Sequence, residues 1–289
     1  MNKPKVHAIF YGYKNRVLKE SVMSAINNAS TDIELKVTVY DQNPLIRDEF
    51  FDKVNNCRYI HIYWDYIISP LSHINSGLSQ EDADYTMVSY GRINLSKDWD
   101  VELIKISNDS NSVVSGKNKT IIKQKNLFYL ETFTDKTNTF EISNYINKDF
   151  IFGRSSVIEK LRFPDYLKHE GVNEVMSLSY FTSGINIYSA PDSLYQITGP
   201  DTIDSTYTTF SKSHGYNEFI QLAKTGKNNH IIIKNRAKSV KEFEEFHGID
   251  LSLINKIPFP MDDVQYKPHE MPFDDIDQKK FMTKVNYIA

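Results

Sequence analysis

The sequence predicts an α/β fold with a mostly parallel central sheet. In the first half of the chain, short apolar runs typical of buried strands alternate with segments whose apolar residues recur at helical spacing. Turn-forming residues such as Gly12 and Pro44 close several of the apolar runs. The composition of the 289 residues, with 40% hydrophobic and 25% charged, is that of an ordinary globular protein. Strands that alternate with helices are typical of layered α/β proteins.

Four strands and three helices are predicted in the first half. The predicted strands cover residues 6–11, 35–40, 58–63 and 85–90, and the predicted helices cover residues 15–28, 69–78 and 99–106. Residues 6–11 and 85–90 are mainly apolar or aromatic, whereas residues 35–40 alternate in the manner of a half-buried strand. In such sheets ligands bind beyond the carboxyl ends of the strands. The residues that follow each strand are therefore the informative ones.

The second half is less regular. Residues 108–139 are polar and give no clear element, and residues 150–153 form a short apolar strand. A helix over residues 170–181 and a strand over residues 185–188 follow. The clearest helix covers residues 239–247, because Ser239 and Glu242 fit a capping box and Gly248 fits a C-terminal cap. We expect one domain over residues 1–250 and an extended tail, residues 251–289, packed on it.

Composition excludes several classes of protein. The single Cys57 excludes a disulfide framework and a Cys-based zinc cluster, and no apolar run approaches the ~20 residues of a membrane span. The net charge of −3 argues against a generally basic nucleic-acid binder but leaves room for local basic stretches. We expect a soluble cytoplasmic protein. The bias toward Ile, Asn, Lys and Tyr, which have AT-rich codons, is typical of many phages and of some bacteria and protists. If a phage encodes the chain, the location is the host cytoplasm.

Common catalytic motifs are absent. The sequence has no GxGxxG, GxxxxGK[ST], HExxH or GxSxG pattern. Asp82 and Asp84 form a DxD pattern, which in other proteins holds a divalent cation against a sugar-nucleotide diphosphate. This pair precedes the strand over residues 85–90, whereas a cation site belongs at the other end of that strand. Solvated acidic residues are therefore the favoured interpretation.

Three segments, residues 85–104, 170–191 and 236–250, together carry a family resemblance. The first is a strand followed by Trp99-Asp100, the second a helix followed by Thr182-Ser183-Gly184 and a strand that leads to Pro191, and the third an acidic aromatic helix before Gly248. They resemble the GT-A-fold retaining glycosyltransferases typified by protist enzymes that attach N-acetylglucosamine to hydroxyproline, with bacterial and phage relatives. The resemblance implies a GT-A-like nucleotide-sugar-binding fold.

The cation-binding motif of that family is not retained. Its Asp-Ser-His falls on Ser89-Tyr90-Gly91, and its later metal-binding His falls on Gln196. Ser, Gly and Gln do not replace carboxylate and imidazole as ligands of a divalent cation. Either the enzyme is metal-independent, with basic groups such as Arg92 facing the diphosphate, or the domain has lost catalysis and kept a binding role. We therefore assign no firm cofactor, and a divalent cation stays open.

The resemblance, together with the positions of residues that follow the predicted strands, indicates two groups of candidate site residues. The catalytic candidates are Glu174 and Glu170, which would orient the acceptor hydroxyl or stabilise positive charge at the anomeric carbon. The candidates for donor binding are Tyr11, Tyr13, Asp41, Trp64, Ser89, Tyr90, Gly91 and Arg92. Several of them have a structural alternative: a helix-start acid for Glu174, core packing for Tyr11, Tyr13 and Trp64, a turn for Asp41 and a surface position for Arg92.

Two basic stretches lack acidic residues and are candidates for binding the acceptor or its phosphates. Their predicted contact residues are Lys117, Lys119, Lys123, Lys125, Lys234, Arg236 and Lys238. Solvated faces are the alternative. The favoured function is transfer of a sugar, most simply from a UDP-sugar, to a hydroxymethylated or already glycosylated base of phage DNA. A protein hydroxyl is the second acceptor, and a non-catalytic binding module is the hypothesis from another class.

Overall fold

The computed structural model describes residues 3–13, 17–42, 47–62, 70–78, 80–109, 111–116, 119–124, 127–132, 139–160, 163, 172–197, 221–225, 237–248 and 250–251. The chain divides into two units, Met1–Ile257 and Pro258–Ala289, and all described residues belong to the first. The predicted tail, residues 251–289, lies almost wholly outside the described residues and stays a prediction.

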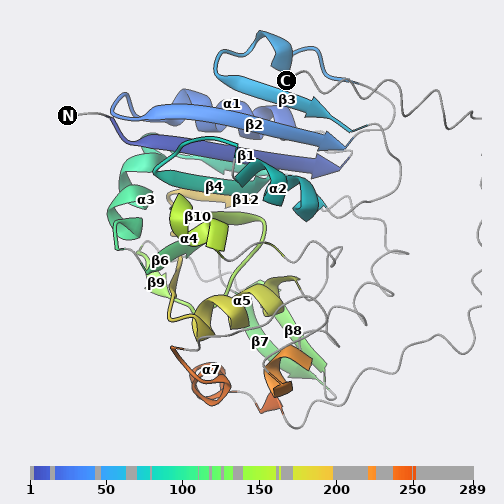
Figure 1. Ribbon diagram of the computed structural model, residues 1–289, viewed down its shortest axis with the longest axis vertical. Helices are drawn as coiled ribbons and strands as arrows, with labels where there is room; N and C mark the ends of the chain where they lie inside the picture. Colours follow the sequence, from blue (N-terminus) through green and yellow to red (C-terminus); the bar gives the residue numbers. More distant parts are fainter. Residues whose placement is uncertain are drawn as a thin grey trace, which may run out of the picture. The chain divides into compact units, whose positions relative to one another are not determined.

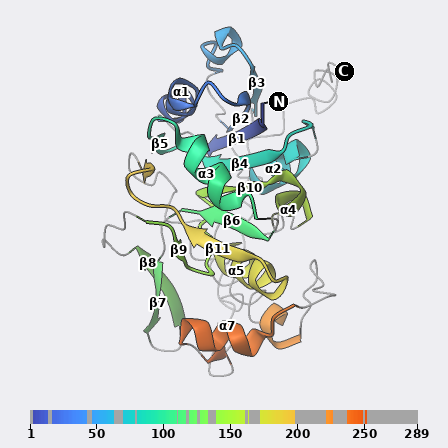
Figure 2. The ribbon, with the colours of Figure 1, turned by 90° about the vertical axis from the view of Figure 1, so that its left-hand side faces the viewer.

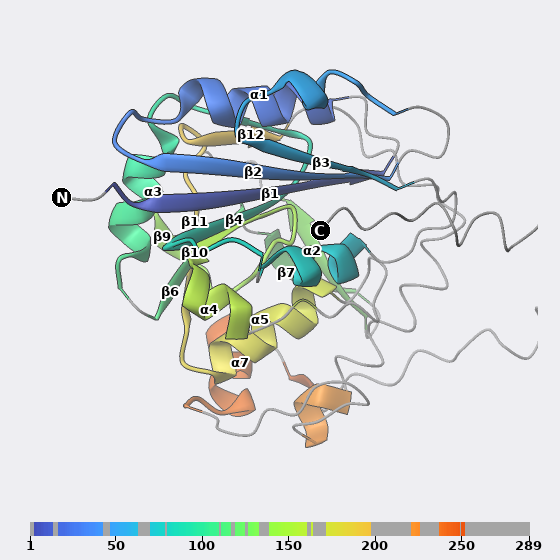
Figure 3. The ribbon, with the colours of Figure 1, turned by 45° about the horizontal axis from the view of Figure 1, so that its top comes forward.

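An eight-stranded sheet forms the centre of the first unit (Figures 1 and 3). Its strands, in spatial order, are β3 (Cys57–His61), β2 (Glu34–Gln42), β1 (Lys5–Tyr13), β4 (Tyr85–Tyr90), β10 (Phe150–Arg154), β6 (Ser112–Ser115), β11 (Asn186–Ser189) and β9 (Glu141–Ile142). Strands β3, β2, β1 and β4 are parallel neighbours, and β11 is parallel to β6. Strand β10 is antiparallel to both β4 and β6, and β9 is antiparallel to β11. The predicted mixed α/β fold with a mostly parallel sheet is confirmed.

Helices cover both faces of this sheet, as Figure 2 shows. The helices are α1 (Leu18–Asn28), α2 (Pro70–Leu78), α3 (Trp99–Ser107), α4 (Ser155–Lys160), α5 (Val172–Thr182) and α7 (Val240–His247). Along β1, Ala8 and Phe10 join the core that contains α1 and α3, whereas Ile9 and Tyr11 join the core that contains α2, α4 and α5. This alternation follows from the two-residue period of a strand and explains why the run is apolar throughout.

Two antiparallel pairs stand beside the central sheet. Strand β5 (Ile93–Leu95) pairs with β12 (Tyr195–Ile197), and β7 (Lys119–Gln124) pairs with β8 (Leu127–Thr132). Hydroxyls of α1 hold β5, because Ser21 Oγ accepts from the Ile93 N–H at 2.9 Å and Ser24 Oγ accepts from the Leu95 N–H at 2.6 Å. Strand β5 therefore follows α1 away from the carboxyl ends of β1 and β4.

Helix α7 begins and ends as the sequence predicts. Ser239 and Glu242 form a capping box, and Gly248 adopts a left-handed conformation with φ of 63°. The buried rings of Phe181 and Phe243, with centroids 5.4 Å apart, join α7 to α5.

Some element boundaries differ from the predicted ones. Helix α1 begins at Leu18, β3 ends at His61, and the polar middle of the chain contains β6, β7 and β8. Strand β6 has only two apolar residues, Val113 and Val114, which is too short a pattern to identify from sequence. Among the described residues, no helix has the length and apolar character needed to cross a membrane.

Candidate functional site

Residues 147–149, which we call the hub segment, lie where several strands end. They directly precede β10, and because β10 is antiparallel to β4 and β6, its first residue lies near the last residues of those strands. The Tyr90 N–H donates to the Asp149 carbonyl at 3.0 Å, and the Gly116 N–H donates to the Phe150 carbonyl at 2.8 Å. The hub segment is thus fixed at the carboxyl edge of the parallel strands, where α/β proteins bind ligands.

Side chains from three other elements converge on the hub segment. The Tyr11 hydroxyl at the end of β1 donates to the Lys148 carbonyl at 3.1 Å. The Ser89 hydroxyl of β4 donates to the Asp149 carbonyl, also at 3.1 Å. At the start of α5, the Asn173 side-chain oxygen accepts from the Lys148 N–H at 2.9 Å. The structure therefore brings the predicted donor residues of β1 and β4 close to the predicted catalytic helix start.

The hub segment also carries a partly buried ion cluster. Arg92 Nη2 lies 3.1 Å from Asp149 Oδ2, and Lys148 Nζ lies 3.2 Å from Asp149 Oδ1. The three side chains are only 12–18% exposed. Burial opposes ionisation of Asp149, but the adjacent Lys148 and Arg92 outweigh it and hold the pKa of this carboxyl at about 2. Arg92 and Lys148 thus place a guanidinium and an ammonium group at the sheet edge, and both are groups that bind anions in proteins.

The predicted aromatic donor residues have mixed positions. Tyr11 and Tyr90 are buried, and their rings pack with centroids 5.2 Å apart. This burial favours the packing role that the sequence leaves open for Tyr11. Tyr13 ends β1, but its side chain and the whole of Trp64 lie outside the described residues.

Asp41 lies near the end of β2, at the same edge as the hub segment. The Tyr59 hydroxyl of β3 donates to Asp41 Oδ2 at 2.8 Å and accepts from the Asp48 N–H at 3.1 Å. Burial raises the pKa of Asp41, while the Tyr59 hydrogen bond opposes that rise. Asp41 is thus a buried carboxylate that accepts a hydrogen bond at the strand end, and its role in donor binding stays a prediction.

The positions that match the family's metal ligands do not fit a cation. Ser89 is fully buried, and its hydroxyl donates to backbone carbonyls. A Cβ atom at Gly91 would overlap Leu18 Cδ1 and lie 3.3 Å from the Leu18 Cα. Gln196 is exposed on β12, opposite Asn94. Within the described ranges, no three His, Cys, Asp or Glu residues are grouped so as to hold a metal ion.

Asp82 and Asp84 lie at the opposite edge of the sheet. Lys5 Nζ pairs with Asp82 at 3.1 Å, and the Lys5 N–H donates to Asp84 Oδ2 at 2.8 Å. The side chain of Asp82 is 98% exposed. The DxD pattern therefore joins the starts of β1 and β4, away from the hub segment.

Glu174 lies in the first turn of α5 and is 9% exposed. Its neighbour Asn173 contacts the hub segment, so the helix start is fixed relative to Arg92 through residues 147–149. Glu170 lies outside the described residues. The place of Glu174 on the acceptor side of the site and its catalytic role both stay predictions.

The basic stretches are described only in part. Lys119 and Lys123 belong to β7, but their side chains are not described, and Lys117, Lys125, Lys234 and Arg236 lie outside the described residues. Lys238 Nζ lies 4.7 Å from the Phe181 ring centroid and 3.4 Å from Asn186 Oδ1. Lys238 thus contacts protein groups, whereas the arrangement of the other six residues stays a prediction.

Sequence reasoning missed the hub segment and its partner Asn173. A local signal exists, since three polar residues, Asn147-Lys148-Asp149, directly precede an apolar strand. Its meaning depends on strand direction: before a parallel strand these residues would lie at the amino edge, and before an antiparallel strand they lie at the carboxyl edge. Nothing in the local sequence gives that direction.

We expect Asp149→Asn to destabilise the protein, because it leaves Arg92 and Lys148 without their shared carboxylate. The folded-state pKa is depressed to about 2, so the stabilisation is present above the unfolded-state pKa and is lost as the pH falls from about 4 toward 2. At pH 7 the variant should lose ~2 kcal/mol of unfolding free energy. Denaturant titrations across this pH range measure the effect. Asp82→Asn is the exposed control, and equal stability of the Asp149 variant and the wild type at pH 7 would contradict the prediction.

Comparisons with known proteins agree with this architecture. No protein-family model and no curated protein matches the sequence. A crystal structure of S. aureus TarS is similar, with a TM-score of 0.55 and 12% identity, over 76% of this chain and 39% of that chain. A second structure, of S. aureus TarS 1–349, gives a TM-score of 0.47 and 13% identity, over 78% of this chain and 73% of that one. The chain thus spans about two fifths of the first TarS chain, and the likeness is one of fold: a GT-A-like α/β fold.

Proposed function

We propose that the chain is a glycosyltransferase that moves a sugar from a nucleotide-sugar donor, most simply a UDP-sugar, to an acceptor hydroxyl. The observation that carries the proposal is the Arg92–Asp149–Lys148 cluster at the carboxyl edge of the sheet. A planar guanidinium pairs well with phosphate oxygens, and an ammonium group is a second common phosphate partner. The fold shared with TarS, a glycosyltransferase, supports the same class, as does the resemblance to hydroxyproline N-acetylglucosaminyltransferases.

In this proposal the donor lies across the ends of β2, β1 and β4. Asp41 accepts hydrogen bonds from the nucleoside, and the diphosphate lies against Arg92 and Lys148. The acceptor oxygen then forms a bond to the anomeric carbon while the bond from that carbon to the phosphate oxygen breaks. The electron pair of the broken bond leaves with the nucleoside diphosphate. Glu174 orients the acceptor hydroxyl and takes its proton, or stabilises the positive charge at the anomeric carbon.

The proposed reaction needs no divalent cation. The buried hydroxyl of Ser89, the closed position of Gly91 and the exposed Gln196 do not supply a ligand set. Arg92 and Lys148 instead provide the positive charge that a leaving diphosphate requires.

Calorimetric titration of UDP in the presence of EDTA tests this site. We expect the wild type to bind UDP without added metal, and Arg92→Gln to weaken binding by ~10–100-fold, as for loss of a charged hydrogen bond. Arg154→Gln is the matched control, because Arg154 ends β10 at the opposite edge and bonds to Asn108. Binding that requires manganese or magnesium, or that is equally strong in the Arg92 variant, would contradict the proposed donor site.

We expect Glu174→Gln to lower kcat by ~10²–10³ with little change in donor affinity, if the carboxylate acts in the transition state. Steady-state kinetics with a panel of nucleotide sugars measures this, with Glu159→Gln on the exposed face of α4 as the control. A variant that turns over normally but melts at a lower temperature assigns Glu174 to the stability of α5 instead. A wild type that binds nucleotide sugars without transfer or hydrolysis would favour a non-catalytic binding module.

For the acceptor we propose a modified base of DNA, with a protein hydroxyl as the second candidate. The basic stretches support the first choice through phosphate binding. Replacing Lys119, Lys123, Lys234 and Arg236 by Gln should weaken DNA binding and reduce the slope of log affinity against log salt by about one unit per lost phosphate contact. Binding at several salt concentrations measures the slope. No affinity of the wild type for DNA at low salt would favour the protein or glycan acceptor.

A further inference from the structure

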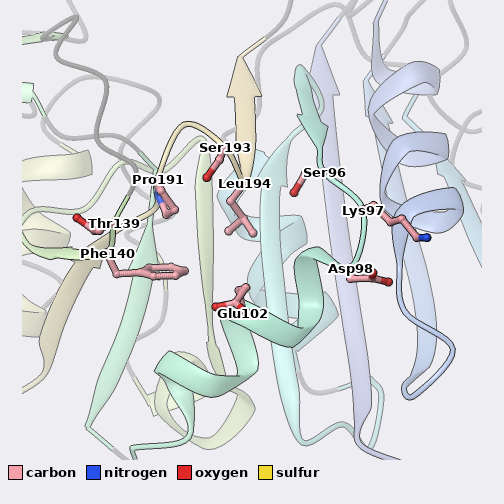
Figure 4. A pocket seen from close by; sticks show the side chains of 9 residues that line it. All are labelled: Ser96, Lys97, Asp98, Glu102, Thr139, Phe140, Pro191, Ser193 and Leu194. Atoms are coloured by element: carbon pink, nitrogen blue, oxygen red, sulfur yellow. The ribbon is translucent and has the colours of Figure 1, made fainter.

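A separate cavity of about 440 Å³ lies on the α1 and α3 side of the sheet, as Figure 4 shows. Its size is within the range of small-molecule sites, ~300–1,000 Å³. Its lining residues come from the β5–α3 connection, α3, the segment before β9 and the β11–β12 connection: Ser96, Lys97, Asp98, Glu102, Thr139, Phe140, Pro191, Ser193 and Leu194.

Backbone contacts fix the walls of this cavity. The Ser96 N–H donates to the Leu194 carbonyl at 2.9 Å, which joins the β11–β12 connection to the end of β5. The Asp98 N–H donates to the Asn28 carbonyl at 2.7 Å, at the end of α1. The chain that forms these walls follows β5 or pairs with it, and β5 runs away from the hub segment. None of the lining residues belongs to the proposed donor site.

The lining combines an apolar surface with a polar rim. The Phe140 ring, the Leu194 side chain and the Glu102 carboxylate converge on the centre in Figure 4, and Pro191 adds a further apolar contact. Leu194 and Pro191 are buried, whereas Asp98 and Glu102 are exposed. Asp98 precedes α3 but makes no side-chain capping bond. Among the described contacts, neither the Asp98 nor the Glu102 carboxylate has a hydrogen bond or an ion pair with the protein.

We propose that this cavity binds a neutral pyranose unit of a glycan. A pyranose ring has an apolar C–H face that packs on an aromatic or aliphatic surface, and hydroxyls around its edge that donate to carboxylates. The hydroxyls of Ser96, Thr139 and Ser193 supply further partners of both kinds. A purely apolar ligand would bury the Glu102 carboxylate without a partner, and an anionic one would face that carboxylate (Figure 4). The site goes beyond the proposed function, because it needs neither the donor nor turnover.

Titration of the full chain with methyl α- and β-pyranosides of glucose, galactose and N-acetylglucosamine tests the site. Saturation-transfer NMR and calorimetry should detect at least one of them with a dissociation constant of ~1 mM, or about −4 kcal/mol. Phe140→Ala, and separately the double variant Asp98→Asn with Glu102→Gln, should each weaken binding at least ~10-fold. Lys105→Gln is the control on the same helix, outside the lining, and should bind as the wild type does.

The proposal is overturned if no pyranoside binds at ~50 mM, roughly fifty times the expected dissociation constant, or if both cavity variants bind as well as the control. It is also overturned if UDP displaces the pyranosides competitively, because the sugar would then lie at the donor edge. The UDP titration on the same preparation keeps the two proposals apart. If the protein binds pyranosides through Phe140 but does not bind UDP, the proposed donor site is contradicted and the cavity is not. If it binds UDP but no pyranoside, the proposed cavity site is contradicted and the donor site is not.

Discussion

The carboxyl edge of the sheet depends on the ion pairs that the Asp149 carboxylate makes with Arg92 and Lys148. It holds two cations that are largely removed from water, and such charges are tolerated in a protein only when they are paired. The same residue accepts through its backbone carbonyl from Tyr90 and Ser89, so the electrostatic and the backbone contacts of the edge coincide. The backbone of Lys148 adds two further contacts, because its carbonyl accepts from the Tyr11 hydroxyl and its N–H donates to the Asn173 side chain. One antiparallel strand thus sets the relative positions of two parallel strands and a helix start.

The course of the chain after β4 separates two chemically different surfaces. Arg92 and Lys148 place two cationic groups at the strand ends, whereas the cavity beside α3 has carboxylates and an aromatic ring in its lining. Strand β5 separates the two surfaces. Its hydrogen bonds to Ser21 and Ser24 hold it along α1, so the chain runs away from the hub segment before it reaches α3. An anion and a neutral polyol would each favour a different one of these surfaces.

Elements with a strong local signal could be predicted from the sequence, and long-range relations could not. The strand Tyr85–Tyr90 and the capping box of α7 agree with their sequence patterns, because burial and capping act over a few residues. The bounds of α5 are less clear from the sequence than those of α7. Almost all side chains from Val172 to Thr182 are buried, so the segment lacks the alternation of apolar and polar residues that marks a helix with one exposed face. Arg92 was a candidate from its place after β4. Its partner Asp149 is 57 residues away in sequence, and only the direction of β10 brings the two together.

The contact between Gly91 and Leu18 constrains how this chain could change by mutation. Any side chain at position 91 overlaps Leu18, which is itself buried at the start of α1. A side chain at position 91 therefore requires Leu18 to move or to be replaced by a smaller residue, and such a replacement leaves a void in the core. The effect of a substitution at position 91 therefore depends on the residue at position 18.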